Sequence, residues 1–221
     1  MKIQLALDRM SITEAVAMAR CTEPYIDWIE VGTSLIKEYG MASVEAMRRE
    51  FPQKVIVADM KTFDNAKYEF ELCFKAGADV ATVMGAAPPV TVKLCVETAE
   101  RFGRQTMIDL LHTSPKQQRE LSQYTQVIHC LHISKDQQEV EESRQIAASN
   151  GPELTSLSDT MVRLQIAAAG GITLESLPNL LPLRPAVLIV GSAITKASDP
   201  AQAARAIKAW IEEQERVNKD E

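Results

Sequence analysis

The chain has 221 residues, of which 46% are hydrophobic and 24% charged, and its formal charge is −6 at pH 7. This length suits one large α/β core, and the acidic balance disfavours nucleic acid as a partner because phosphate backbones attract clustered Lys and Arg. No apolar run approaches the roughly 18 residues that a membrane-spanning helix needs, so we expect no membrane segment.

Short apolar runs recur along the chain and alternate with helical patterns. Near-continuous runs of this length are typical of parallel strands that are buried on both faces. In chain order, the predicted strands are 3–8, 25–32, 54–60, 79–84, 105–111, 126–132, 163–171 and 186–191. The predicted helices are 11–20, 40–51, 66–77, 90–103, 114–124, a stretch around 150–162, 174–181 and 199–217.

Helix boundary signals support this order. Ser11 is followed three residues later by Glu14, as in a capping box, and Pro200 lies just inside a predicted helix start. Gly77 and Gly103 lie where helices should stop. Eight strands alternating with about eight helices predict a (β/α)8 TIM barrel that spans 1–221 as a single domain, with a doubly wound open sheet as the alternative. The polar stretch 138–153 is expected to belong to a long loop after the sixth strand.

The cysteines and the first residues indicate the cellular compartment of the protein. Cys21, Cys73, Cys95 and Cys130 lie far apart without a C-x-x-C spacing, which favours reduced thiols over a disulfide framework or a closed zinc site. The opening MKIQLALD already has the pattern of a strand, so we expect no signal peptide. We therefore expect a soluble, cytoplasmic protein.

Polar residues end or follow most of the predicted strands. In a barrel of this type the active site forms at the carboxyl ends of the strands. A single acid after a strand is usually a helix cap or a solvated loop residue, but several converging charges need a cation or a substrate to compensate them. The residues concerned are Asp8, Glu30, Asp59, Lys61, Asp64, Asp109 and His132.

Two of these acids suggest a metal. Glu30 and Asp59 end neighbouring strands, and Mg²⁺ prefers one or two carboxylates together with water and substrate oxygens. The three histidines and four cysteines show no spacing for a closed zinc site. The sequence therefore favours Mg²⁺ over zinc.

Glycines follow the last two predicted strands, as Gly170 and Gly171 after the seventh and Gly191, with Ser192, after the eighth. Loops at these positions of a TIM barrel frequently bind phosphate. Glycine lets backbone N–H groups approach oxyanions closely, and a following helix end adds favourable potential. Two tight turns without a ligand are the alternative; for the pair we prefer a phosphate site.

Six segments resemble the orotidine 5′-monophosphate decarboxylase suprafamily: LALD, IEVGT, VADMKTFD, AGADVATV, AAGGITLESLP and IVGSAITKASDP. Within it, the sequence is most similar to 3-hexulose-6-phosphate synthase and 3-keto-L-gulonate-6-phosphate decarboxylase. The resemblance runs from Gln4 to Ala204, and the D-x-K-x-x-D motif after the third strand is its most specific part.

The resemblance implies roles for these residues and a sugar phosphate as substrate. Glu30 and Asp59 would hold Mg²⁺, and Lys61 would contact substrate oxygens beside Asp8. Asp64 would reach into the partner's site, which makes a homodimer with shared active sites part of the prediction. Both relatives form a cis-1,2-enediolate on a ketose phosphate, and His132 is suited to move protons because histidine has a reference pKa near 6.5.

The two relatives differ at positions that this chain also carries. Asp109 on the fifth strand and Ser192, where the decarboxylase would carry Arg, resemble the synthase. The segment HISKD instead resembles His-x-Ser-Arg-Asp of the decarboxylase, with Lys135 in place of Arg. We therefore expect an aldolase of the synthase type that condenses formaldehyde with D-ribulose 5-phosphate, with the decarboxylase as the alternative.

Departures from the family pattern keep other functions open. Residues 65–67 read Asn-Ala-Lys where the family usually has glycine, 112–113 replace familiar polar residues, and 138–153 is unusually charged. One alternative is a non-catalytic sugar-phosphate-binding barrel. Another is a pentose-phosphate epimerase, which would need metal-binding histidines, whereas here only His132 lies at a predicted strand end.

Overall fold

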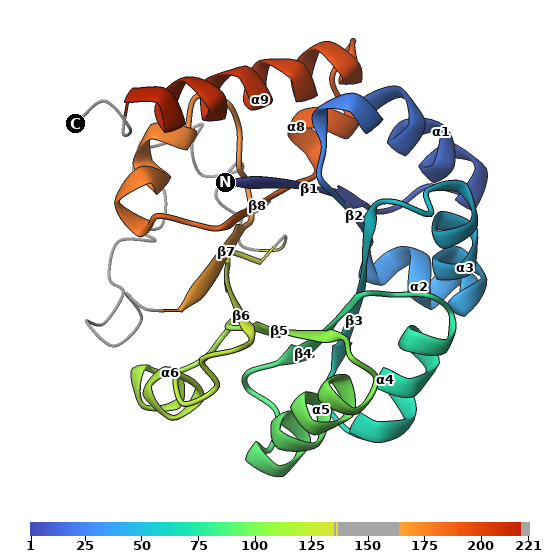
Figure 1. Ribbon diagram of the computed structural model, residues 1–221, viewed down its shortest axis with the longest axis vertical. Coiled ribbons are helices and arrows are strands. Elements are labelled where there is room, and N and C mark those ends of the chain that lie inside the picture. Colours follow the sequence, from blue (N-terminus) through green and yellow to red (C-terminus); the bar gives the residue numbers. More distant parts are fainter. Residues whose placement is uncertain (135, 137–163, 218–221) are drawn as a thin grey trace.

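Residues 1–134, 136 and 164–217 are described in the computed structural model, in which eight parallel strands form a closed barrel (Figure 1). The strands are β1 Lys2–Leu7, β2 Trp28–Val31, β3 Val55–Thr62, β4 Val80–Met84, β5 Gln105–Asp109, β6 Ile128–His132, β7 Gln165–Ala169 and β8 Val187–Val190. β1 pairs with β8, so the sheet has no edge. The barrel prediction is confirmed, and the open-sheet alternative is wrong because it would leave two edge strands unpaired.

Helices surround the barrel on its outside (Figure 1). The described α-helices are α1 Ile12–Thr22, α2 Thr33–Tyr39, α3 Met41–Glu50, α4 Ala66–Lys75, α5 Pro89–Arg101, α6 Pro115–Leu121, α8 Ser192–Thr195 and α9 Pro200–Val217. Ser11 and Glu14 form the predicted capping box before α1. Gly77 and Gly103, with φ of +103° and +62°, follow α4 and α5 in the left-handed region that glycine enters easily. These boundary predictions are confirmed.

Some predicted elements differ in kind or extent. The helix predicted over 174–181 is a 3₁₀-helix, η3 Leu177–Leu183, because Pro182 within it cannot donate to an α-helical ladder. The strand predicted over 25–32 begins only at Trp28, since the short 3₁₀-helix η1 occupies Glu23–Tyr25. The predicted helix around 150–162 and the predicted loop 138–153 lie outside the described residues.

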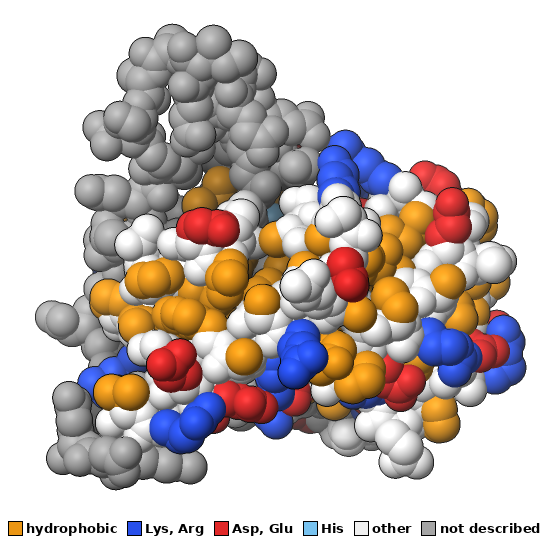
Figure 2. Space-filling model, turned by 90° about the horizontal axis from the view of Figure 1, so that it is seen from above, with side chains coloured by type: hydrophobic (Ala, Val, Ile, Leu, Met, Phe, Trp, Pro, Cys, Tyr) orange, Lys and Arg blue, Asp and Glu red, His pale blue; other side chains and the backbone are white. Residues whose placement is uncertain are grey.

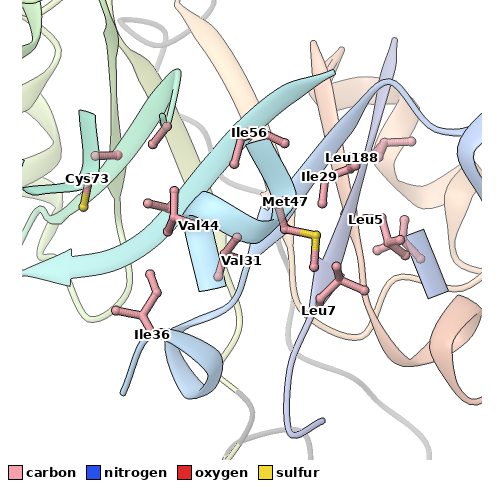
Figure 3. Close-up of a cluster of buried hydrophobic side chains, with 14 of the residues drawn as sticks. Leu5, Leu7, Ile29, Val31, Ile36, Val44, Met47, Ile56, Cys73 and Leu188 are labelled. Atoms are coloured by element: carbon pink, nitrogen blue, oxygen red, sulfur yellow. The ribbon is translucent and has the colours of Figure 1, made fainter. Parts of the chain in front are cut away.

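The outward faces of the strands pack against the helices. Alternate residues of the first three strands have no exposed surface, namely Leu5, Leu7, Ile29, Val31 and Ile56. Figure 3 shows several of them meeting Val44 and Met47 of α3. Each such side chain contributes roughly 1.5–3 kcal/mol when fully buried. This layer fixes the strands on which the polar residues stand.

The inward faces of the strands change character along the barrel axis. One layer of the interior is apolar and contains Trp28, Val57, Val80, Met107 and Cys130. Two residues further along the same five strands stand Glu30, Asp59, Thr82, Asp109 and His132. Because side chains of a strand return to the same face every second residue, this repeated switch gathers five polar side chains at the carboxyl end of the barrel.

The outer surface of the described residues mixes charged and apolar side chains (Figure 2). Among the helices in the described part of the chain, none combines the length and the apolar character of a membrane span. Figure 2 shows one face, on which acidic and basic side chains are interspersed with apolar ones. The described side chains of that face therefore lack the continuous basic patch that nucleic-acid phosphates select.

Candidate active site

Four of the predicted site residues meet at the carboxyl ends of β3, β5 and β6, and we call Asp59, Lys61, Asp109 and His132 the Lys61 cluster. The Nζ of Lys61 donates to Asp59 Oδ1 at 3.1 Å and to Asp109 Oδ2 at 2.9 Å. The Nδ1 of His132 lies 2.8 Å from the same Oδ2 of Asp109. Both carboxylates are buried, with 7% and 3% of Asp59 and Asp109 exposed. The sequence placed these residues at strand ends, and the structure joins them by direct contacts.

The charges in the Lys61 cluster are fixed by their neighbours. Burial would raise the pKa of Asp109, but the hydrogen bond from His132 and the charge of Lys61 outweigh it and lower that pKa to about 2. Burial lowers the pKa of Lys61, whereas the carboxylates of Asp59 and Asp109 raise it, and the net shift is upward. Lys61 therefore stays positive at neutral pH, which suits it to stabilise developing negative charge rather than to act as a base.

Asp109 fixes the tautomer of His132, that is, which of its ring nitrogens carries the proton. An ionised carboxylate can only accept, so Nδ1 of His132 carries the proton in their contact. The Nε2 of the neutral ring is then left as a proton acceptor. The other two histidines are placed differently: His112 is exposed, and Nε2 of the fully buried His129 lies 3.2 Å from the carbonyl oxygen of Leu121.

Two threonine hydroxyls orient Asp59. The Oγ1 of Thr33 donates to Asp59 Oδ2 at 2.6 Å, and Oγ1 of Thr82 donates to Asp59 Oδ1 at 2.9 Å. Thr33 was visible in the sequence as a polar residue after β2, but Thr82 was not predicted. Its signal is a polar residue on the inward face of an otherwise apolar strand, and only the pairing of β4 with β3 reveals its partner.

Glu30 lies on β2, beside Asp59 of β3, and is 6% exposed. Burial and the neighbouring carboxylate of Asp59 raise the pKa of Glu30 to about 8. Its Oε2 accepts from Nε2 of Gln4, and the Oε1 of this buried amide has no hydrogen-bond partner among the described atoms. Gln4 was not singled out as a site residue by the sequence. Lys61 contacts Asp59, but burial and the charge of Asp59 outweigh its effect on Glu30, so a further positive charge beside the two acids would be favourable.

A divalent cation fits this donor set. Mg²⁺ binds through one or two carboxylates and completes its shell with water and substrate oxygens, and its charge would relieve the repulsion between Glu30 and Asp59. Within the described ranges no three His, Cys, Asp or Glu side chains gather closely enough to form a metal site by themselves. The residues therefore suit an open magnesium site better than a closed zinc site.

Asp8 stands at the same end of the barrel, after β1. Its Oδ1 accepts from Oγ of Ser34 at 2.7 Å, at the start of α2, so its hydrogen bonds are with Ser34 and not with Lys61. Its charge nevertheless contributes to the raised pKa of Glu30. Gly32 lies beside it, and a Cβ there would lie 2.4 Å from the carboxylate of Asp8, so a larger residue would require this side chain to move.

Asp64 is not joined to the Lys61 cluster within one chain. It is exposed, and its Oδ1 accepts from the backbone N–H of Asn65 at 2.8 Å. Two large apolar side chains near it in sequence, Phe63 and Tyr68, are 54% and 61% exposed. The segment after β3 therefore presents an acid and two aromatic rings to its surroundings.

The predicted phosphate residues lie in the turns after β7 and β8. Gly170 and Gly171 have φ of +101° and +65°, and a Cβ on Gly170 would lie 2.3 Å from the carbonyl oxygen of Ile133. Gly191 precedes the short helix α8, which begins at Ser192. Both turns leave the carboxyl ends of adjacent strands, the end that carries the Lys61 cluster. Their role in phosphate binding stays a prediction.

The family model for the orotidine 5′-phosphate decarboxylase / HUMPS family matches residues 1–207. The chain belongs to this family. The prediction drawn from the sequence motifs is thereby confirmed. The match runs from β1 into the first part of α9, so it includes every site residue named above.

Relatives within the orotidine 5′-phosphate decarboxylase / HUMPS family match nearly the whole length of the chain. The 3-hexulose-6-phosphate synthase of Bacillus subtilis is 34% identical and covers 96% of this chain and 99% of its own. The crystal structure of 3-hexulose-6-phosphate synthase from Salmonella typhimurium has a TM-score of 0.83 at 33% identity and covers 95% and 97%. A crystal structure of KGPDC from Streptococcus mutans has a TM-score of 0.84 at 25% identity and covers 96% and 97%.

Proposed function

We propose that the protein is a Mg²⁺-dependent aldolase of the 3-hexulose-6-phosphate synthase type, which condenses formaldehyde with D-ribulose 5-phosphate through a 1,2-enediolate. The observation that carries the proposal is the position of Lys61, whose ammonium group lies between Asp59 and Asp109 while His132 shares Asp109. Two relatives named 3-hexulose-6-phosphate synthase, which are 34% and 33% identical to this chain, support an enzyme of the lyase type.

The proton transfers are assigned to His132. Its free Nε2 takes a proton from C1 of ribulose 5-phosphate, and the electron pair left behind forms the enediolate. Carbon C1 then attacks formaldehyde, whose oxygen becomes an alkoxide and recovers a proton from the imidazolium of His132. Asp109 keeps the ring oriented and stabilises the imidazolium, because its own pKa is too low for it to take the proton.

Lys61, and a magnesium ion held by the two acids, would stabilise the negative charge of the enediolate. The ammonium group of Lys61 supplies a fixed positive charge in a largely buried place, where it acts more strongly than in water. A magnesium ion held by Glu30 and Asp59 would supply further positive charge to stabilise the enediolate. The backbone N–H groups around Gly171 and Ser192 are assigned to the phosphate of the substrate.

The decarboxylase of the same family is the second candidate. The fold does not separate the two activities, since the TM-scores to a synthase and to a KGPDC are 0.83 and 0.84. Sequence identity favours the synthase, because the chain is 33% identical to the synthase structure and 25% identical to the KGPDC structure. Asp109 and Ser192 point the same way, as they match the synthase pattern.

A direct assay of the purified protein with Mg²⁺ separates the candidates. We expect ribulose 5-phosphate to be consumed only when formaldehyde is present, with no CO₂ released from 3-keto-L-gulonate 6-phosphate. Release of CO₂ without formaldehyde-dependent consumption would establish the decarboxylase instead. If neither substrate reacts but either one raises the melting temperature, the barrel is a non-catalytic binder of sugar phosphates.

We further propose a homodimer in which Asp64 of the partner subunit completes each site. The exposed Asp64 lies outside the Lys61 cluster of its own chain, and the exposed rings of Phe63 and Tyr68 provide apolar area for an interface. A twofold interface would use this segment on both subunits.

Mixing two inactive variants tests the shared site. Lys61→Ala and Asp64→Ala are each expected to be inactive, but a heterodimer of the two has one site with both residues intact. After the subunits are unfolded and refolded together, about a quarter of the wild-type activity should return, because half of the dimers are mixed and each has one intact site. A mixture that stays inactive, although light scattering shows dimers, would place Asp64 and Lys61 in the same chain's site.

A further inference from the structure

The pairing of β3 with β4 is irregular at the Asp59–Lys61 segment. Ala58 pairs with Ala81, and Thr62 pairs with Val83, so three residues of β3 stand opposite one residue of β4. That single residue is Thr82. A bulge of this kind re-aims the side chains of the longer strand, and bulges are common beside active sites.

Lys61 has a backbone conformation that a side chain normally avoids. Its φ is +50°, in the left-handed region, where a residue other than glycine is strained unless its surroundings hold it. Its backbone N–H donates to Oγ1 of Thr82 at 2.8 Å instead of continuing the ladder to a carbonyl of β4. The strained residue is therefore anchored by a side chain.

The hydroxyl of Thr82 makes both of its hydrogen bonds within the motif. It accepts from the backbone of Lys61 and donates to Asp59 Oδ1 at 2.9 Å, which is also an acceptor for the ammonium group of Lys61. Thr82 is 3% exposed, so water does not easily replace it. One buried hydroxyl thus connects the backbone of Lys61 with the carboxylate that its side chain contacts.

We infer that Thr82 is a positioning residue, whose hydroxyl holds Lys61 in the left-handed conformation and thereby fixes Nζ between Asp59 and Asp109. When enzyme activity is measured, the inference rests on the proposed function, because the expected loss of turnover comes from the misplacement of Lys61. It does not require Thr82 to touch the substrate.

The test compares two threonines that differ in their contacts. Thr82→Val keeps the shape of the side chain but removes the hydroxyl and leaves the N–H of Lys61 without an acceptor. Thr106 of β5 is equally buried, at 2% exposed, and its Oγ1 has no partner among the described atoms, so Thr106→Val is the matched control. Thr82→Ser restores a hydroxyl at the tested position.

We expect Thr82→Val to lower kcat by about 100-fold, with a much smaller change in KM for ribulose 5-phosphate, because misplacement of a catalytic group by about 1 Å has effects of this size. Thr82→Ser should recover most of kcat, and Thr106→Val should leave it unchanged. A Thr82→Val enzyme with wild-type kcat would overturn the inference, as would a folded Thr82→Ser enzyme as slow as Thr82→Val. If Thr82→Val does not fold, Thr82→Ala is measured in its place with the same expectation.

Crystal structures separate this inference from the proposed function. In Thr82→Val we expect φ of Lys61 to leave the left-handed region and the contact between Nζ and Asp109 to be lost, while Thr106→Val keeps both. If the wild-type protein turns over neither sugar phosphate, the proposed function fails. The crystal structures of the variants then test the positioning role of Thr82 by themselves. A Thr82→Val structure that keeps the φ of Lys61 and both of its carboxylate contacts would rule out the positioning role.

Discussion

Replacing Lys61 with methionine should lower kcat for formaldehyde-dependent turnover by about 100- to 1,000-fold, since the loss of one group that stabilises a developing oxyanion has effects of this size. Methionine keeps much of the length of the side chain but removes the ammonium group that Asp59 and Asp109 share. Steady-state kinetics with saturating Mg²⁺ measures the loss. Because the charge acts on the transition state, the effect should appear in kcat more than in KM.

The same variant should also be less stable. Without the ammonium group, two buried carboxylates lose a compensating charge, and an uncompensated buried charge is destabilising. We therefore expect a lower melting temperature at pH 7, with the difference from wild type shrinking as the pH falls, because Lys61 lowers the pKa of Asp109 and this stabilising contribution is lost in acid. Calorimetry at several pH values measures this difference.

Lys54→Met is the matched control at the opposite end of β3. The ammonium group of Lys54 donates to the carbonyl oxygens of Glu23 and Ile26 at 2.8 and 2.6 Å, away from the Lys61 cluster. Its loss should reduce stability but leave kcat unchanged. Retained turnover in Lys61→Met, or an equal loss in Lys54→Met, would contradict the role assigned to Lys61.

The fold could be predicted because its signals are local and repeated. Each strand carries a near-continuous apolar run, and helix boundaries such as Ser11 with Glu14 depend on residues a few positions apart. Closure of the barrel followed from the number and alternation of these elements. The exact form of the segment after β7 did not, because Pro182 lies inside η3 and cannot donate to an α-helical ladder, although the apolar spacing resembles that of an α-helix.

The candidate site could be predicted only in part. Asp59, Lys61, Asp109 and His132 could be placed at one end of the barrel because they follow apolar strands with the right parity. Their mutual contacts depend on strand register, which the sequence does not display. Thr82 was missed for that reason: its partner is set by three residues of β3 standing opposite one residue of β4. Only a bulge, with Lys61 at φ +50°, brings the hydroxyl to the motif.

Replacing Glu30 with glutamine should have opposite effects on stability and activity. Burial and the carboxylate of Asp59 raise the pKa of Glu30 from its ordinary 4.5 to about 8. The folded chain therefore binds more protons than the unfolded chain between these two pH values, and the unfavourable contribution of Glu30 grows as the pH rises. At pH 7 an uncharged glutamine should stabilise the metal-free protein by up to about 3 kcal/mol, as a shift of one pKa unit corresponds to about 1.4 kcal/mol.

Calorimetry of both proteins between pH 4 and pH 8 measures this difference. The gain from Glu30→Gln should be small near pH 4 and largest near pH 8. Glu50→Gln is the control, because Glu50 lies on the outer helix α3 and its Oε2 accepts from Arg20 at 2.6 Å. It should show no gain that rises with pH. A Glu30→Gln protein that is less stable than wild type at pH 7.5 would contradict the burial cost assigned to this carboxylate.

Magnesium should reverse the order of the two proteins. An ion that binds the folded state raises the melting temperature, and Glu30 must release its proton to bind one, so the increase should grow in the wild-type protein as the pH approaches 8. Glu30→Gln removes this ligand charge, and we expect both the magnesium-induced stabilisation and the turnover to fall steeply. An equal increase with magnesium in both proteins would place the ion elsewhere. A stabilised but inactive Glu30→Gln protein would show that this buried acid is kept for metal binding at the expense of stability.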